Sequence, residues 1–369
     1  MNCWDLNIVV AFCLSVCLAG IVIPKILSIA FRKKLFDEPD ERKIHTSLVP
    51  RLGGIAFKPV IFFTISLLIG IDMSLGNHVL VDAAATQVRP FAFVYCAIML
   101  LYLIGIADDL IGIRYRAKFV VQILSAIMLI AGGLCINNLE GFLGINELNN
   151  WFAYPFTVLL VVFIINAMNL IDGIDGLASG LSSVAMAFYA FLFYRAGEYL
   201  YALIAVSTLG VLVPFFYYNV FGDPAKQKKI FMGDTGSLTI GMMICFLSFK
   251  MAILPVREGD MVPNPLILAF SPLLVPCLDV IRVYLGRVRK RQNPFLPDKT
   301  HIHHKFLAIG MHQRTAMITI LTVSILFTSC NIILSHYLNI TYILIIDIVA
   351  WTIMNMWLSQ KRKALQKAL

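Results

Sequence analysis

Residues 151–168 read WFAYPFTVLLVVFIINAM and contain no charged side chain. As an α-helix this segment would extend about 27 Å, close to the hydrocarbon thickness of a membrane. Residues 169–176 follow directly, read NLIDGIDG, and carry two aspartates among glycines. The segment therefore predicts a membrane-spanning helix that ends at a pair of acidic side chains.

Apolar runs of this kind recur along the whole chain. Of its 369 residues 59% are hydrophobic and 14% are charged, whereas soluble domains carry about 25% charged residues. The runs long enough to span a membrane are 6–30, 54–71, 91–107, 119–136, 151–168, 177–194, 200–218, 237–254, 265–285, 315–337 and 341–358. They predict an all-α polytopic membrane protein of about 11 transmembrane helices. Residues 1–369 would form a single integral membrane domain, and the composition excludes a soluble, disordered or outer-membrane barrel protein.

The positive charges predict how the chain lies in the membrane. Loops 32–52, 108–118, 219–236 and 286–314, together with the C-terminal tail, hold 23 Lys and Arg residues, against about four in the opposite loops. Because cytoplasmic loops are enriched in Lys and Arg, the N-terminus is predicted outside and the C-terminus in the cytoplasm. The net charge of +9 is then explained by these loops, and we expect no nucleic-acid partner.

Acidic and histidine side chains gather on that same predicted cytoplasmic face. The motif-bearing loops are about 32–53, 108–118, 169–176, 219–236 and 286–314, and four of them supply these residues. The candidates are Asp108, Asp109, Asp172, Asp175, Asp234, His301, His303 and His304. Ionisable groups next to a membrane span cost several kcal/mol unless they are compensated, so they are functional candidates. Their gathering on one face predicts one shared site.

Each group also has a structural interpretation. Asp108 and Asp109 would cap a helix well only at its N-terminus, whereas they follow the end of a span. Two adjacent carboxylates at that end repel each other, so a cation or cationic side chain is expected opposite them. The histidines resemble a surface cluster or a zinc site, but structural zinc takes four Cys or His ligands and these loops hold no cysteine. Carboxylates beside basic residues better suit a phosphorylated substrate bridged by Mg²⁺, which prefers oxygen ligands.

Five motifs together resemble the polyprenyl-phosphate N-acetylhexosamine-1-phosphate transferases, which are glycosyltransferase family 4. The motifs are Arg42-Lys43-x-His45 leading to Pro50-Arg51-Leu-Gly-Gly, Asp108-Asp109 followed by Lys118 and Gln122, Asn166-Ala-Met-Asn169-Leu-Ile-Asp-Gly-Ile-Asp-Gly, Phe231-Met-Gly-Asp-Thr-Gly-Ser, and Asn293-Pro-Phe with Asp298-x-x-His301-Ile-His-His. They occur in the family's order over about residues 37–310, which makes the resemblance specific. The family's topology also has about ten or eleven spans.

The resemblance implies a reaction and its partners. N-acetylhexosamine 1-phosphate, most often GlcNAc 1-phosphate, would pass from a UDP-sugar to undecaprenyl phosphate, giving undecaprenyl-diphospho-sugar and UMP. This is a first membrane step of a cell-envelope polysaccharide such as O-antigen or teichoic acid. It implies the bacterial cytoplasmic (inner) membrane, a site on the cytoplasmic face, and contact with the bilayer. A homodimer is compatible with it.

Residue roles are carried over by motif position. Asp234 with Asn169 would hold Mg²⁺, for which Mn²⁺ is an alternative, and Asp108, Asp109, Asp172 and Asp175 would be catalytic. The residues expected to bind substrate are Lys43, His45, Lys118, Arg287, His301, His303 and His304. Many members carry an acidic residue where this chain has Gly112, so no role is carried over to that position.

Two alternatives stay open at this point. The phospho-N-acetylmuramoyl-pentapeptide transferases of peptidoglycan synthesis typically show Pro-Thr-Met-Gly-Gly and three consecutive histidines, whereas this chain differs in both motifs. A transporter of a phosphorylated metabolite would need ionisable groups near the bilayer midplane and related halves. Asp347 is the main mid-span acid, while Asp279 and Arg282 are predicted to form a structural pair. The sequence does not select one UDP-sugar.

Overall fold

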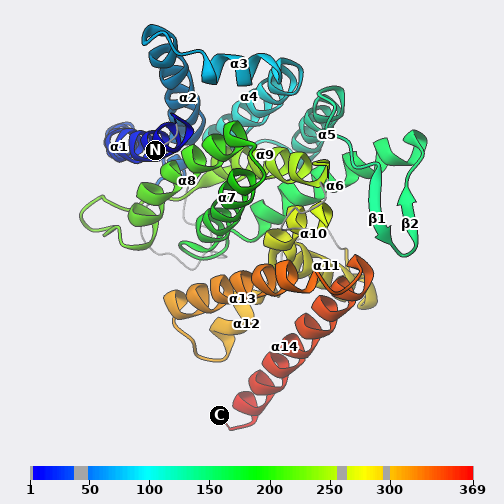
Figure 1. The fold of residues 1–369 in the computed structure, drawn as a ribbon. Coiled ribbons are helices and arrows are strands. Elements are labelled where there is room, and N and C mark those ends of the chain that lie inside the picture. Colours follow the sequence, from blue (N-terminus) through cyan, green and yellow to red (C-terminus); the bar gives the residue numbers. More distant parts are fainter. Residues whose placement is uncertain (1–2, 37–48, 256–263, 294–299, 369) are drawn as a thin grey trace.

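The structure, a computed structural model, describes residues 3–36, 49–255, 264–293 and 300–368. Within these ranges it is almost entirely helical (Figure 1). The elements are α1 (Cys3–Arg32), η1 (Gly53–Ala56), α2 (Phe57–Ser74), α3 (Val79–Ala85), α4 (Val88–Ile111), α5 (Tyr115–Ala131), β1 (Asn138–Phe142), β2 (Ile145–Glu147), α6 (Asn150–Leu170), α7 (Leu177–Arg195), α8 (Tyr199–Val220), α9 (Gly233–Ala252), α10 (Pro265–Phe270), η2 (Ser271–Leu273), α11 (Leu274–Arg289), α12 (Ile302–Ala308), α13 (Gln313–Leu334) and α14 (Ile340–Ala368).

Ten helical segments in the described parts of the chain are long and apolar enough to cross a membrane. They confirm the predicted all-α, polytopic fold, and ten of the eleven predicted spans lie on them. The remaining prediction, 119–136, falls on α5, which has only 17 residues because the chain turns at Gly132. Arg89, at the start of α4, donates to the Ala131 carbonyl at the end of α5 (2.9 Å). Since Lys118 at the other end of α5 contacts Asp108, α5 runs antiparallel along nearly all of α4.

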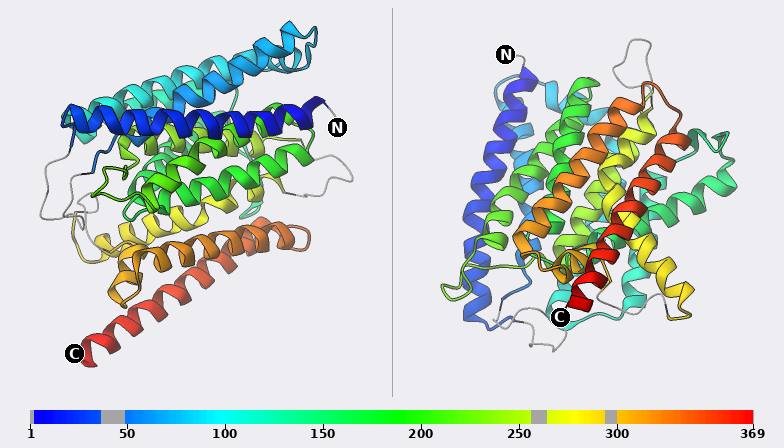
Figure 2. Two further views of the ribbon diagram at one scale, coloured as in Figure 1. Left: turned by 90° about the vertical axis from the view of Figure 1, so that its left-hand side faces the viewer. Right: turned by 90° about the horizontal axis from the view of Figure 1, so that it is seen from below.

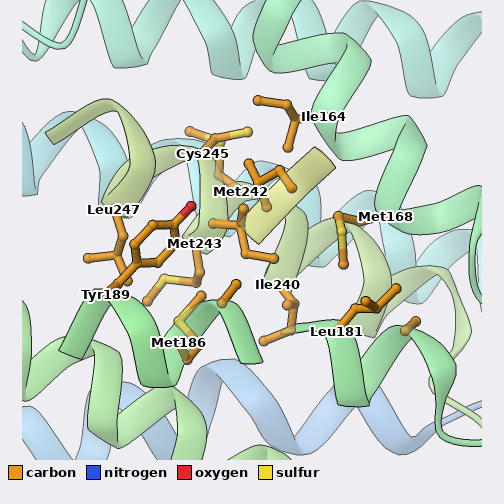
Figure 3. Packing of buried hydrophobic residues seen from close by; sticks show 14 of the residues in the cluster. Ile164, Met168, Leu181, Met186, Tyr189, Ile240, Met242, Met243, Cys245 and Leu247 are labelled. Atoms are coloured by element: carbon orange, nitrogen blue, oxygen red, sulfur yellow. The ribbon is translucent and has the colours of Figure 1, made fainter. Parts of the chain in front are cut away.

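Helix α9 lies at the centre of the bundle. It packs against α4, α6, α7, η1 and α10, and 17 of its 20 residues are buried. A helix that is covered on all sides needs no polar face, which explains its nearly continuous apolar sequence. Figure 3 shows its Met242, Met243 and Cys245 packed between Ile164 of α6 and Tyr189 of α7. These neighbours fix the position of the N-terminus of α9.

The Pro50-Arg51-Leu-Gly-Gly motif is joined to residues 231–236 through the backbone. Gly53 and Gly54 donate to the carbonyls of Phe231 and Met232 (both 3.0 Å), and Phe231 donates to the Pro50 carbonyl (2.9 Å). A Cβ atom at Gly54 would overlap the backbone of Gly236. The glycine pair is therefore needed because two chain segments approach at backbone contact distance.

A small antiparallel hairpin of β1 and β2 lies between the predicted spans 119–136 and 151–168, where the sequence predicted no strand. The hairpin lies at one edge of the bundle (Figure 1), where the backbone N–H of Leu143 donates to Thr341 of α14 (2.7 Å). The two chain ends lie at opposite ends of the bundle (Figure 2). The ten long helices of the described chain together with α5 make an odd number of crossings, which predicts this arrangement. Which end faces the cytoplasm stays a prediction.

The predicted orientation can be tested by labelling single cysteines with a membrane-impermeant maleimide, after the eight native cysteines are replaced. Suitable exposed sites at the predicted cytoplasmic ends are Ile111, Leu170 and Lys228, and Leu75 and Trp151 lie at the other ends of their helices. In right-side-out vesicles we expect labelling at Leu75 and Trp151 only, and in inverted vesicles the reverse. Labelling of Ile111, Leu170 or Lys228 from outside would contradict the orientation.

Candidate functional site

Asp109, near the end of α4, is bound to the first turn of α9. Its Oδ1 accepts the backbone N–H of Asp234 (2.8 Å), and its Oδ2 accepts the N–H and the hydroxyl of Thr235 (2.9 and 2.6 Å). A carboxylate at this place satisfies unpaired helix N–H groups and complements the helix dipole. Asp109 therefore caps a helix, but that helix is α9 and not its own. Its contacts fix the backbone that carries Asp234.

Asp234 lies at the centre of a polar cluster drawn from four helices. Lys118 of α5 donates to Asp234 Oδ2 (2.7 Å) and also to Asp108 Oδ2 (3.2 Å). Asn169 of α6 donates to Asp234 Oδ1 (3.0 Å) and to the hydroxyl of Ser237 (2.8 Å). The ammonium group of Lys118 thus neutralises two carboxylates that would otherwise repel each other. All four residues are only partly exposed, which strengthens their electrostatic interaction.

The turn at residues 171–176 holds the next two aspartates beside this cluster. Asp172 is exposed and lies close enough to Arg51, Asp175 and Asp234 to interact with their charges. Asp175 forms a partly buried ion pair with Lys229. The turn is held from behind by Asn219, which accepts the N–H of Gly176 (2.6 Å) and donates to the Ile230 carbonyl (2.8 Å). Gly176 suits this turn because its φ is +79°.

The histidine segment is anchored by a buried aspartate on α11. Asp279 pairs with Arg282 (2.7 Å), which confirms the predicted structural pair. It also contacts His301 Nδ1 (2.8 Å) and accepts the N–H of Ile302 (3.0 Å), so it orients the start of α12. The rings of His301 and His303 are nearly parallel, with centroids 5.9 Å apart.

His303 connects α12 to the aspartate turn. Its ring is buried and packs directly on the backbone of Gly173. Burial, reinforced by the neighbouring His304 and His301, lowers the pKa of His303 to about 3. The ring is therefore neutral near pH 7 and acts as a hydrogen-bonding group rather than as a cation. Both ring nitrogens are buried and neither has a hydrogen-bond partner among the described residues, so their hydrogen-bonding capacity is unused.

The structure thus brings together most residues that the sequence singled out. Asp108, Asp109, Lys118, Asn169 and Asp234 form the central cluster. The turn carrying Asp172 and Asp175 directly follows Asn169 in the chain, and His303 packs on its Gly173. Arg287 instead lines a separate basic pocket between α11 and α14. Lys43 and His45 fall outside the described residues.

Several residues of the site were missed by the sequence analysis. They are Thr235, Ser237, Asn219, Lys229 and the His301-orienting role of Asp279. Thr235 and Ser237 stand within the quoted Phe231-Met-Gly-Asp-Thr-Gly-Ser motif, so their hydroxyls were a usable signal.

Asp347 is buried in α14, where Asn331 donates to it (2.9 Å) and to Ser271 (3.1 Å). This contact gives the mid-span acid a structural role.

The central cluster is compatible with Mg²⁺. Among the described residues, no three His, Cys, Asp or Glu side chains lie together as a ready-made metal site. Mg²⁺, however, commonly takes only one or two protein carboxylates and completes its shell with water and substrate phosphates. Asp234 and Asp108, brought together around Lys118, and the amide of Asn169 offer that oxygen-rich donor set.

An apolar groove lies beside two of the helices that supply the cluster. It has a volume of about 620 Å³ and lies between α5 and α6. Its lining begins at Phe119, next to Lys118, and continues through Ile123, Ile127 and Ile130 on α5. Val162, Leu159, Val158, Pro155 and Tyr154 line the α6 side. The groove therefore begins one residue after Lys118, and its own lining contains none of the cluster side chains.

Comparisons with known proteins agree with this arrangement. The sequence model of glycosyl transferase family 4 matches residues 91–252, which include Asp108, Asp109, Asp172, Asp175 and Asp234. A probable undecaprenyl-phosphate N-acetylglucosaminyl 1-phosphate transferase of Bacillus subtilis is 34% identical over 89% of this chain and 85% of its own length. The undecaprenyl-phosphate alpha-N-acetylglucosaminyl 1-phosphate transferase of Escherichia coli strain K12 is 29% identical over 88% and 83%.

The counterpart of the same name in Yersinia pestis is 30% identical over 83% of this chain and 78% of its own length. These relatives cover most of the chain, and their names include N-acetylglucosamine rather than the pentapeptide-bearing sugar. The chain therefore belongs to glycosyl transferase family 4, as a relative of the undecaprenyl-phosphate N-acetylglucosaminyl 1-phosphate transferases.

Proposed function

We propose that this protein transfers GlcNAc 1-phosphate from UDP-GlcNAc to undecaprenyl phosphate, forming undecaprenyl-diphospho-GlcNAc and releasing UMP. The observation that carries the proposal is the cluster of Asp108, Lys118, Asn169 and Asp234 beside an apolar groove whose lining begins at Phe119, the residue after Lys118. A lipid phosphate needs both features, because its tail stays in the bilayer while its headgroup meets a water-soluble donor.

The reaction forms one phosphorus–oxygen bond and breaks another. An oxygen of the lipid phosphate attacks the sugar-bearing phosphorus of the donor, and the bond to the uridine-bearing phosphate breaks, so that UMP leaves. A phosphate monoester is largely ionised near pH 7, so no strong base is required. The work of the protein is then to position two anionic substrates and to screen their repulsion.

Separate parts of the site serve these tasks. Lys118 would hold the lipid phosphate, since it belongs to the cluster and directly precedes Phe119, the first lining residue of the groove. His303 presents neutral ring nitrogens beside the aspartate turn and suits the donor's diphosphate or sugar. Asp109 positions the first turn of α9 and does not itself touch substrate, because its oxygens accept hydrogen bonds from that turn.

Mg²⁺ would be held by Asp234, together with Asp108 and Asn169. When bound, it would neutralise the diphosphate and the charge that develops on the departing UMP. Mn²⁺ is a plausible substitute with the same oxygen preference. The chain itself contributes the alignment of Asp234, which depends on the cap from Asp109 and on Asn169.

The groove between α5 and α6 would hold the first isoprene units of the lipid. Apart from the Tyr154 hydroxyl its lining is apolar, and it begins at Phe119, directly after Lys118, so a bound tail would place its phosphate near the cluster. By the charge distribution this end of the bundle faces the cytoplasm of a bacterial cell, where nucleotide sugars are made. The product would begin a cell-envelope polysaccharide such as O-antigen or teichoic acid.

The donor can be identified with the purified protein, undecaprenyl phosphate and Mg²⁺. We expect lipid product from UDP-GlcNAc and little or none from UDP-N-acetylmuramoyl-pentapeptide, with UDP-GalNAc as the epimer control. Transfer from the pentapeptide donor alone would move the assignment to the peptidoglycan branch. No transfer from any UDP-sugar would contradict the proposed activity.

Removing the His303 ring tests its role in donor binding. Hydrogen bonds to charged groups contribute about 1.5–3 kcal/mol, so His303→Ala should lower kcat/KM by roughly 10- to 150-fold, mainly through the donor's KM. Arg287→Ala should have a much smaller effect on the donor's KM, because Arg287 lines the separate pocket between α11 and α14. His336→Ala, at an exposed position in the opposite half of the bundle, is the control. Unchanged kinetics for His303→Ala would exclude it from the site.

A further inference from the structure

A second pocket lies apart from the aspartates, between α11, α12 and the C-terminal part of α14. It has a volume of about 310 Å³, and six of its twelve lining residues are Lys or Arg. These are Arg282, Arg287, Lys290, Lys305, Arg362 and Lys363. No acidic residue lines it within the described parts of the chain. Such a surplus of positive charge in a recess attracts an anion.

This pocket is separate from the cluster around Asp234. His303 and Lys305 are two residues apart on α12, so about 200° of helix rotation turns them to opposite sides. His303 faces Gly173 in the aspartate turn, whereas Lys305 lines the pocket. An anion bound here would therefore lie on the far side of α12 from the transfer site.

Two cationic side chains of the pocket, Arg282 and the half-buried Lys305, keep hydrogen-bonding capacity that no described residue uses. The terminal nitrogen of Arg282 donates to Asp279 and to the Thr300 carbonyl (both 2.7 Å), but its Nε is buried without a partner among the described residues. Lys305 meets only the neutral side chains of Asn355 and Ser359 (3.0 and 3.3 Å). Burial, with the charge of Arg282, lowers the pKa of Lys305 to about 8. Unpaired buried donors cost free energy, which an anionic acceptor would recover.

The surroundings place the pocket at the boundary between membrane and water. Two helices that form the pocket expose apolar side chains just before its basic residues in the chain. These are Ile281, Tyr284 and Leu285 on α11, and Ile353, Met356 and Trp357 on α14. Beyond them the helices carry cations, and Lys361 lies over the Trp357 ring at 5.1 Å. Trp and Tyr followed by Lys and Arg mark the interfacial level of a membrane helix.

We propose that this pocket binds the phosphate of an anionic membrane phospholipid, such as phosphatidylglycerol. Basic pockets between transmembrane helices at the cytoplasmic side recognise anionic headgroups in this way. A nucleotide diphosphate offers the same chemistry, but the exposed apolar surface leading to the pocket suits a ligand with acyl chains. The inference goes beyond the proposed transfer reaction and does not depend on it.

Native mass spectrometry of the purified full-length protein can test this, with phosphatidylglycerol and phosphatidylcholine of identical acyl chains as probes. We expect the wild type to bind phosphatidylglycerol more tightly. The double substitution Arg362→Gln and Lys363→Gln should weaken phosphatidylglycerol binding about 10-fold or more and leave phosphatidylcholine binding unchanged. Both residues are exposed at the end of α14, so the variant should fold, which its thermal unfolding would show.

The matched control removes two positive charges elsewhere. Lys33→Gln with Lys34→Gln acts at exposed positions at the end of α1 and should leave phosphatidylglycerol binding unchanged. Equal losses in both double variants, or no loss in either, would overturn the proposed site. A parallel titration with UDP distinguishes the source of the phosphate. If the Arg362 and Lys363 variant loses UDP binding and keeps phosphatidylglycerol binding, the ligand is a soluble diphosphate and the lipid proposal is wrong.

Discussion

Asp234→Asn is expected to lower kcat/KM at least about 100-fold, because it removes the carboxylate at the centre of the cluster while preserving its shape. The apparent affinity for Mg²⁺ should fall by about 10-fold or more, since a neutral amide is a weaker ligand for a hard cation. Lys118 would also lose its shorter ion pair, of 2.7 Å. The measurement is transfer rate against Mg²⁺ concentration for the wild type and the variant.

Asp223→Asn provides the control for this experiment. Asp223 stands in the loop before the same motif, pairs loosely with the exposed Lys226 (3.9 Å), and lies outside the cluster. Its substitution should leave both turnover and the Mg²⁺ dependence unchanged. If Asp234→Asn retains near-normal turnover over the whole Mg²⁺ range, then Asp234 does not hold the metal.

Gly54→Ala should abolish activity and lower thermal stability, even though it adds only a methyl group. The new Cβ would overlap the backbone nitrogen and Cα of Gly236, and backbone atoms in two packed segments cannot move aside as a side chain can. Overpacking of this kind costs about 1–3 kcal/mol or more. The strain would act on the turn that carries Asp234. Thermal unfolding and the transfer assay together measure the effect.

Gly70→Ala is the matched substitution in the same region of the sequence. Gly70 lies in α2, and a Cβ there would meet no atom within 4 Å. Alanine is the better helix former, so this variant should be as stable as the wild type or slightly more stable. If Gly54→Ala behaves like Gly70→Ala, the close approach between residues 50–54 and 231–236 is not important for the site.

The apolar runs predicted most of the fold because membrane spans need long uninterrupted apolar segments. The hairpin at 138–147 was not predicted from the sequence, since two short strands produce a much weaker pattern than a span.

Gly112, which departs from the family pattern, ends α4 with a φ of +69°. A residue with a side chain would be strained there, so this position serves the backbone rather than the chemistry.

The site was predicted as a set of residues but not as an arrangement. Charge counting placed the aspartates on one face, and the structure brings Asp108, Asp109 and Asp234 together. The capping role of Asp109 was not visible, because the helix it caps begins about 125 residues later in the chain. Contacts between distant segments, such as His303 on Gly173, have no local sequence pattern.

The central claim is that transfer occurs at phosphorus, so that the sugar moves together with one phosphate. A donor carrying ³²P in the sugar-linked phosphate and ¹⁴C in the GlcNAc ring tests it directly. The account predicts that both labels enter the lipid product in a 1:1 ratio and that unlabelled UMP is released. Lipid that contains ¹⁴C without ³²P, with labelled UDP released, would show attack at the sugar carbon and contradict the account.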